Sequence, residues 1–195
     1  LRYNITGFGN VAIGNDALGS NTTASNNVGV GTNALKSNTT GDGNTAVGSE
    51  TLSKNTTGKN IVAIGYRALD SNTTGNQNLA IGTDSLGSNT TGYSNFGMGV
   101  NALTSLTTGH NNVAIGIDSL RYNTTAANNV AIGNDALKNN TRDGNTAIGT
   151  KALAINTTGN NLVAIGYKAL DENSSGSSNV AIGNDALGSN TTASN

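Results

Sequence analysis

Residues that favour β-structure alternate with small ones over a three-residue stretch that ends in glycine, and this stretch recurs along the whole chain. Val11, Ala12 and Ile13 precede Gly14, and a similar triplet precedes ten further glycines. Successive glycines are 17 residues apart, except for one interval of 16 between the eighth and the ninth. A period this short and regular predicts an array of units that stack on their neighbours. The glycines are Gly14, Gly31, Gly48, Gly65, Gly82, Gly99, Gly116, Gly133, Gly149, Gly166 and Gly183.

The alternation predicts one short strand in each unit, because successive side chains of a strand point to opposite faces. We expect the Val and Ile side chains to fill the interior and the Ala or Gly between them to face the other way. Four residues after each glycine stands an invariant leucine, as at Leu18 and Leu35. We interpret it as part of a second short strand that sends its side chain into the same interior.

The other positions of the unit favour corners and turns. The invariant glycine suits a corner with positive φ, and the Ser-Asn-Thr-Thr-Gly stretch that follows, as in 37–41, is rich in turn residues. Asn stands seven residues after the glycine in every unit except at Leu106, and four residues before it except at Ile61 and Leu162. Stacked at one residue per unit, these amides can donate to one neighbour and accept from the other.

Seventeen residues with β-favouring triplets and Gly/Asn corners fit one coil of a solenoid, whereas helical repeats usually need more than ~30 residues. The predicted fold is all-β: a parallel β-solenoid (β-roll) in which 1–195 form one repetitive segment of about eleven coils. Coils stacked at ~4.8 Å give a rod of roughly 50 Å. Residues 42–48 echo 143–149, which indicates block duplication. Because the chain starts and stops in mid-unit, we expect it to be a slice of a longer fibre.

A rod this thin buries little apolar surface in each coil, so we expect chains to associate side by side. The Ala/Gly positions would form the interface, because small side chains let another backbone come close.

Apolar residues make up 34% of the chain and charged residues 11%, and the net charge is −1. Without a basic cluster or a long apolar run, we expect neither nucleic-acid binding nor insertion of this segment into a membrane. A flexible linker is the alternative that this composition leaves open.

The Asn-Val-Ala-Ile-Gly motif at 10–14 resembles the head repeat of trimeric autotransporter adhesins. That resemblance implies a left-handed parallel β-roll assembled as a parallel homotrimer. The longer unit, as in 43–58, is similar to repeats of phage tail-fibre-like proteins. Both families imply an extracellular place, at a cell surface or on a virion fibre, and a cell-surface glycan or host receptor as a partner. The Ser-Asn-Thr-Thr-Gly half departs from the adhesin repeat and makes the unit longer.

Candidate chemistry is sparse, and we predict no enzyme, no cofactor and no metal site. The single histidine, His110, falls at a variable turn position, which offers no repeated partner for catalysis. Tyr66 with Arg67, and Tyr167 with Lys168, stand just past the corner glycine in equivalent units. Such pairs can stack on sugars, so they are candidate surface contacts; the alternative is that they are two copies of one duplicated surface unit.

The expected function is that of a non-enzymatic structural or adhesive fibre segment that projects or presents a contact surface. The alternative is an ice-binding solenoid. In that case the Asn at the seventh and the Thr at the ninth position after glycine would point outward together and form a flat polar array. Asn-Thr-Thr is also an N-glycosylation acceptor sequence, although these residues suit the turn without any glycan.

Overall fold

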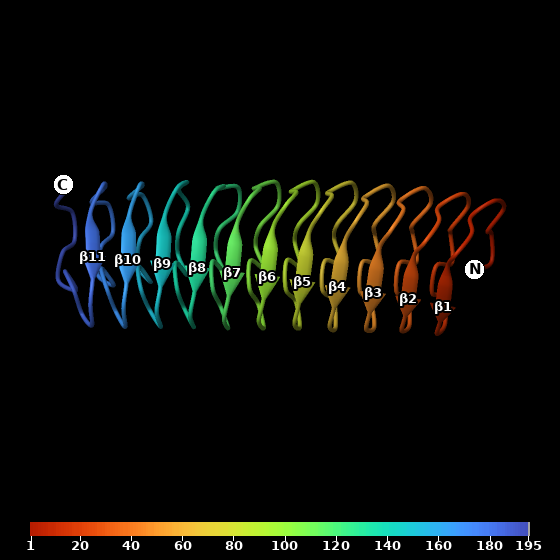
Figure 1. The fold of residues 1–195 in the computed structure, drawn as a ribbon, viewed down its shortest axis with the longest axis horizontal. Coiled ribbons are helices and arrows are strands. Elements are labelled where there is room, and N and C mark those ends of the chain that lie inside the picture. The colour runs from red at the N-terminus through yellow and green to blue at the C-terminus, as the bar shows by residue number, and fades with distance from the viewer. Residues whose placement is uncertain (195) are drawn as a thin grey trace.

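The structure is a computed structural model that describes residues 1–194. It is all-β: eleven parallel strands of three residues stack in sequence order into one sheet, and each strand belongs to one coil of a rod (Figure 1). Asn195, the last residue of the expected repetitive segment, lies outside the described residues. The strands are β1 (Val11–Ile13), β2 (Val28–Val30), β3 (Thr45–Val47), β4 (Val62–Ile64), β5 (Leu79–Ile81), β6 (Phe96–Met98), β7 (Val113–Ile115), β8 (Val130–Ile132), β9 (Thr146–Ile148), β10 (Val163–Ile165) and β11 (Val180–Ile182).

Neighbouring strands pair in strict register with the repeat. Val11 pairs with Val28, 17 residues on, and across the one short unit Val130 still pairs with Thr146. The chain therefore climbs by one strand spacing per coil, and the two ends of the described chain lie at opposite ends of the rod (Figure 1). The predicted β-solenoid of roughly 17-residue coils is confirmed.

The predicted orientation of the strands is wrong, because the small residue of each triplet is the one that faces inward. Ala63 is fully buried, while its neighbours Val62 and Ile64 are 37% and 38% exposed. The reason is the width of the coil. A Cβ added at Gly97 would lie 2.8 Å from Ser85 Oγ and 3.4 Å from Leu86 Cγ. The interior beside each strand therefore has room for a methyl group at most.

From Leu18 to Leu170 the invariant leucines fill the rest of the interior, as predicted, but they do not lie in a strand. Leu35 and Leu69 are fully buried, and their φ angles are +52° and +53°. The residue two before each leucine also has positive φ, as at Asn33 with +58°. Two left-handed residues in such close succession coil the backbone tightly, so no second extended segment can form here. Burial of the leucine side chain offsets the strain of this conformation.

The corner glycines have the conformation that the sequence indicated. Their φ angles run from +124° at Gly14 to +140° at Gly99. Space is restricted as well, because a Cβ at Gly65 would lie 2.7 Å from the carbonyl carbon of Gly82 in the next coil. An L-residue at this corner would therefore meet both backbone strain and a clash with the neighbouring coil.

Both predicted ranks of asparagines form hydrogen-bond ladders inside the rod. Seven residues after the glycine, Asn55 Nδ2 donates to Asn38 Oδ1 at 2.8 Å, and Asn72 Nδ2 donates to Asn55 Oδ1 at 2.8 Å. Four residues before it, the backbone N–H of Asn44 donates to Asn27 Oδ1 at 2.9 Å. We call these the turn ladder and the strand ladder. They satisfy amides that are otherwise shut off from water.

The turn ladder is interrupted at Leu106 and resumes only where Asn156 Nδ2 donates to Asn140 Oδ1 at 2.9 Å, because Asn123 and Asn140 donate to carbonyls of their own coils. Asn89 Oδ1, which would accept from that position, is a buried oxygen without a hydrogen-bond partner. Leu106 itself is fully buried, so at this point the interior replaces an amide by an alkyl side chain. The array thus tolerates an apolar interruption at the cost of one unsatisfied acceptor.

We expect Asn72→Ala to lower the free energy of unfolding by about 1–3 kcal/mol, because it leaves Asn55 Oδ1 unpaired in the interior and removes one of the two hydrogen bonds of Asn89 Nδ2. Asn72→Leu should cost less, since it reproduces the interruption found at Leu106 and fills the space. The control is Thr74→Ala at an exposed position, with an expected cost below ~0.5 kcal/mol. Urea unfolding of the three variants tests this, and equal costs for Asn72→Ala and Thr74→Ala would contradict it.

Candidate functional site

The outward face of the eleven-strand sheet is an apolar surface that extends along the rod. It consists of the first and third residues of each strand, and we call it the sheet face. Exposure is greatest at the ends of the rod, with Ile13 at 60% and Ile182 at 69%. In between, neighbouring strands cover part of each side chain. None of these positions carries a charge: they are Val11, Ile13, Val28, Val30, Thr45, Val47, Val62, Ile64, Leu79, Ile81, Phe96, Met98, Val113, Ile115, Val130, Ile132, Thr146, Ile148, Val163, Ile165, Val180 and Ile182.

Sequence reasoning assigned these residues to the interior and so missed the sheet face. Two signals could have revealed it. The middle position of the triplet accepts only Ala or Gly, which is what a narrow interior requires. The outer positions accept Phe96, Met98 and even Thr45, a range of sizes and polarities that a close-packed core would not tolerate. The expected interface at the Ala/Gly positions is accordingly wrong, because those residues are inside the rod and cannot touch another chain.

The four candidate contact residues are exposed but do not form one site. Tyr66 and Tyr167 are each 51% exposed, and their coils are six apart, which is ~29 Å at the strand spacing. Lys168 Nζ lies 5.8 Å from the ring centroid of Tyr167. Arg67 Nε lies near the carboxylates of Asp70 at 3.6 Å and Asp84 at 3.7 Å, and Lys168 Nζ likewise lies 3.9 Å from Asp171. Lys168 also lines a surface hollow together with Asp171, but neither tyrosine belongs to that hollow.

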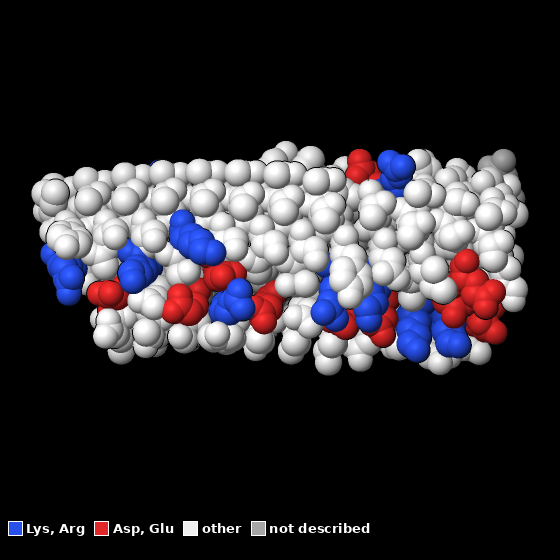
Figure 2. All heavy atoms as spheres, turned by 180° about the vertical axis from the view of Figure 1, so that it is seen from behind, with Lys and Arg blue, Asp and Glu red and all other residues white. Residues whose placement is uncertain are grey.

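Most charged side chains gather along one edge of the rod (Figure 2). They stand at the second, fifth or sixth position after the glycine and pair mainly along and between coils. The tightest group joins Asp118, Asp135 and Lys138: Lys138 Nζ lies 2.7 Å from Asp135 and 3.3 Å from Asp118, and Arg121 lies 3.1 Å from Asp118. Because acids and bases alternate, this edge presents no continuous stripe of one sign.

The charges of this group shift one another's pKa values. Partial burial alone would raise the pKa of Asp118, but hydrogen bonds from Asn101 and Lys138 and the positive charges of Arg121 and Lys138 outweigh burial, so the pKa is lowered from its ordinary value of 3.8. The hydrogen bond to Asp135 raises the pKa of Lys138 above its ordinary value of 10.5. These shifts describe a stabilising ion-pair cluster, with no group tuned toward neutral pH for proton transfer.

The polar array expected for ice binding is not present in the expected form. Asn38 and Asn55 are fully buried in the turn ladder, whereas Thr40 and Thr57 are exposed. The seventh and ninth positions therefore point in opposite directions, because the chain turns here instead of running as a strand.

The asparagines of the N-glycosylation acceptor sequences are these same buried residues. Each Asn amide nitrogen that a glycan would need is already bonded inside the rod.

His110 is half-buried and stacks on Tyr93 of the preceding coil, with ring centroids 4.8 Å apart and planes within 8°. Among the described residues, no group of three or more His, Cys, Asp or Glu side chains lies close enough together to hold a metal ion. The described part of the chain also contains no helix that is both long and apolar enough to pass through a bilayer.

We expect Asp118→Asn to destabilise the rod by about 0.5–1 kcal/mol at neutral pH, the range of partly exposed ion pairs. Because the pKa of Asp118 is lower in the folded protein, its contribution is complete above the unfolded pKa and is lost as the pH falls through the folded value. The melting temperatures of wild type and variant should therefore approach one another as the pH falls below the ordinary carboxyl pKa. Asp185→Asn is the control, because no cation lies within 4.0 Å of Asp185 among the described residues. A difference that persists unchanged at pH 2 would contradict this account.

No family model, no curated protein and no solved structure matches this chain.

Proposed function

We propose that this chain is a non-enzymatic, extracellular fibre segment, and that copies of it assemble in parallel through the sheet face into a homotrimer. The observation that supports this most directly is the sheet face itself, an uncharged apolar strip that runs the whole length of a straight rod. Contiguous apolar surface of this extent is rare on monomeric proteins and is typical of an interaction site.

The sheet face suits a second copy of the same chain better than an unrelated partner. Its side chains recur at the strand spacing, so two parallel copies present ridges and grooves of the same period along their whole length. The face measures roughly 50 Å by 10 Å, from eleven strands of three residues at the usual spacings. That is about 500 Å² in projection, of the order of the ~800 Å² of accessible surface that each partner buries in a standard stable interface.

The resemblance to trimeric adhesin heads supplies the number three and the left-handed coil, and with tail-fibre repeats it supplies the extracellular location. These features stay predictions, as does a cell-surface glycan or host receptor as the fibre's target. Length is the property that the fold itself can set, because each coil adds one strand spacing and makes the same contacts as the last. A segment that adds length without changing its contacts can place a binding domain at a chosen distance from an anchor.

We expect the chain to sediment as a trimer, and the double variant Ile64→Lys with Ile81→Lys to sediment as a monomer. Two adjacent lysines in the middle of the sheet face would put charge into a desolvated interface, while the rod interior stays unchanged. Thr57→Lys with Thr74→Lys is the matched control, since both threonines are exposed on the turn side of neighbouring coils; it should remain a trimer.

Sedimentation equilibrium measures these states, and far-UV circular dichroism checks the fold. If the Ile variant unfolds instead of dissociating, wild type should show a melting temperature that rises with concentration. A folded wild-type monomer whose melting temperature is independent of concentration would overturn the proposal.

Deleting residues 42–142 should shorten the fibre by six coils, or ~29 Å at the strand spacing. The new junction reads Asn38-Thr39-Thr40-Gly41 followed by Asp143, which restores a complete 17-residue unit from Gly31 to Gly149. The remaining coils should therefore stay folded. Small-angle scattering measures the maximum dimension, and a chain that unfolds or keeps its length would contradict the additive-coil account.

One observation keeps ice binding as a second candidate: the ninth position after the glycine forms an exposed rank that is mostly threonine, as at Thr40, Thr57, Thr74 and Thr91. The neighbouring threonines are less suited to it, because the Thr39 hydroxyl donates to the carbonyl of Thr56 inside the array. A single rank lacks the second row that the array in the sequence hypothesis required. Thermal hysteresis in a solution of the purified rod would favour ice binding, and its absence leaves the fibre role.

A further inference from the structure

One coil of the rod is a residue short, and the missing residue is one that is buried elsewhere. A full coil has five residues between its two ladder asparagines, as between Asn38 and Asn44, but only four lie between Asn140 and Asn145. The absent position corresponds to Gly41, which is buried. Strand pairing is kept on the other side of the coil, so the loss is confined to the turn side.

The loss breaks the backbone hydrogen bonds that join the turn of the preceding coil to the turn of this coil. In a regular pair of coils, the N–H groups of Thr39 and Thr40 both donate to the carbonyl of Thr56, at 3.0 and 3.3 Å. At the short coil, the N–H groups of Thr124 and Thr125 have no backbone acceptor among the described residues. Thr125 lines the gap that results. Its N–H group is bonded to no acceptor among the described residues and can serve as a donor to a ligand.

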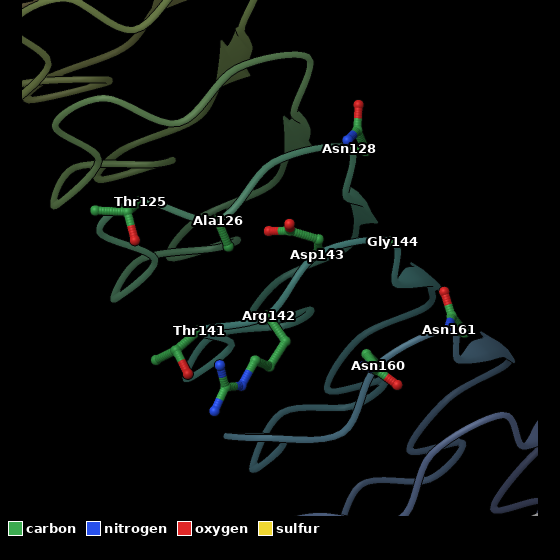
Figure 3. Close-up of a pocket in the computed structure, with 9 residues that line it drawn as sticks. All are labelled: Thr125, Ala126, Asn128, Thr141, Arg142, Asp143, Gly144, Asn160 and Asn161. Carbon is green, nitrogen blue, oxygen red and sulfur yellow. The ribbon is translucent and has the colours of Figure 1, made fainter.

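The gap forms a hollow of about 610 Å³ on the surface, lined mainly by polar side chains. That volume lies within the ~300–1,000 Å³ of typical small-ligand sites. Figure 3 shows the hollow between the segment around Thr125 and Ala126 and the segment around Thr141 and Arg142, with the Asp143 carboxylate directed toward Ala126. Its lining includes Thr125, Thr141, Arg142, Asp143 and Asn160.

Arg142 makes this hollow different from the rest of the turn side. It occupies the position that holds an exposed threonine in most other coils, and it has no carboxylate within 4.0 Å among the described residues. The neighbouring carboxylate of Asp143 also lines the hollow but is directed away from Arg142, and its Oδ1 accepts the backbone N–H of Ala127 at 2.8 Å. The guanidinium therefore keeps its donors free at the edge of a hollow that also holds free backbone donors.

We propose that this hollow binds the carboxylate of an acidic sugar. An arginine fork with backbone N–H groups is the donor set that carboxylates prefer, and the hydroxyl and amide groups of Thr141 and Asn160 are suited to sugar hydroxyls. The site belongs to the single chain and does not require the fibre role or the trimer. The one 16-residue coil would thus give the rod a single polar binding site.

The test uses the full chain and two small probes, methyl glucuronide and methyl glucoside, with saturation-transfer NMR as the readout. We expect transfer to the glucuronide, with weak affinity that falls as salt is added, and at least ~10-fold weaker transfer to the glucoside, which lacks the carboxylate. Arg142→Gln should reduce glucuronide binding by a similar factor. Inserting one glycine between Arg142 and Asp143 should restore the regular coil and abolish binding, with a melting temperature equal to wild type or higher.

The matched control places the arginine one coil away and leaves the hollow in its original position. Thr158 occupies the same position in the next, full-length coil, so Arg142→Thr with Thr158→Arg keeps the net charge and relocates the arginine by one coil. We expect this variant to lose binding. Binding that survives the relocation, equal transfer to both probes, or no effect of Arg142→Gln would overturn the proposal. Sedimentation of Arg142→Gln, expected to match wild type, separates failure of this site from failure of the fibre assembly.

Discussion

The amide hydrogen bonds that pass from coil to coil inside the rod are the interaction on which the rest of the structure depends. Asparagine side chains are buried in both ladders, and most of them bond to the neighbouring coils as well as to their own turn. This requirement favours a constant number of residues per coil, and the one 16-residue coil still places Asn140 and Asn145 at the two ladder positions. Parallel strand pairing in register then follows, and the corner glycines let the coils approach at the strand spacing.

The narrowness of this interior decides where the large apolar side chains go. Leucine and alanine fill the space that the ladders leave. The large side chains at the first and third positions of each strand therefore have to lie outside. The rod consequently carries an uncharged apolar face along its length, with its charges gathered mainly along one edge (Figure 2). In such a chain the buried amides find hydrogen-bond partners within the same chain. The sheet face stays exposed, and association with another chain can cover it. The proposed fibre assembly rests on that division.

The short coil shows how the two ladders change when a coil has one residue fewer. Asn145 Nδ2 donates to Asn140 Oδ1 at 2.9 Å, which joins the strand ladder to the turn ladder across the missing residue. Strand register is preserved. The disturbance lies on the turn side, where the backbone N–H groups of Thr124, Thr125 and Thr141 have no backbone acceptor among the described residues. Asn140 Nδ2 also donates to the carbonyl of Arg142 in its own coil instead of to the preceding ladder asparagine. The array therefore absorbs the deletion without losing strand register, and the result is a hollow beside backbone N–H groups that have no backbone acceptor among the described residues.

The sequence by itself determined the repeat, the strand triplets, the corner glycines, the buried leucines and the two asparagine ladders. Each of these depends on local geometry or on residues that recur at one position per coil, so letters and spacing suffice. The tertiary structure alone decided which side of the triplet faces inward, because alternation defines two faces without saying which is buried. The left-handed backbone at Leu35, the ion pairs around Asp118 and the hollow beside Arg142 likewise emerged only from the folded coil. All of these depend on the width and curvature of the coil, which arise when its turns close against the neighbouring coils.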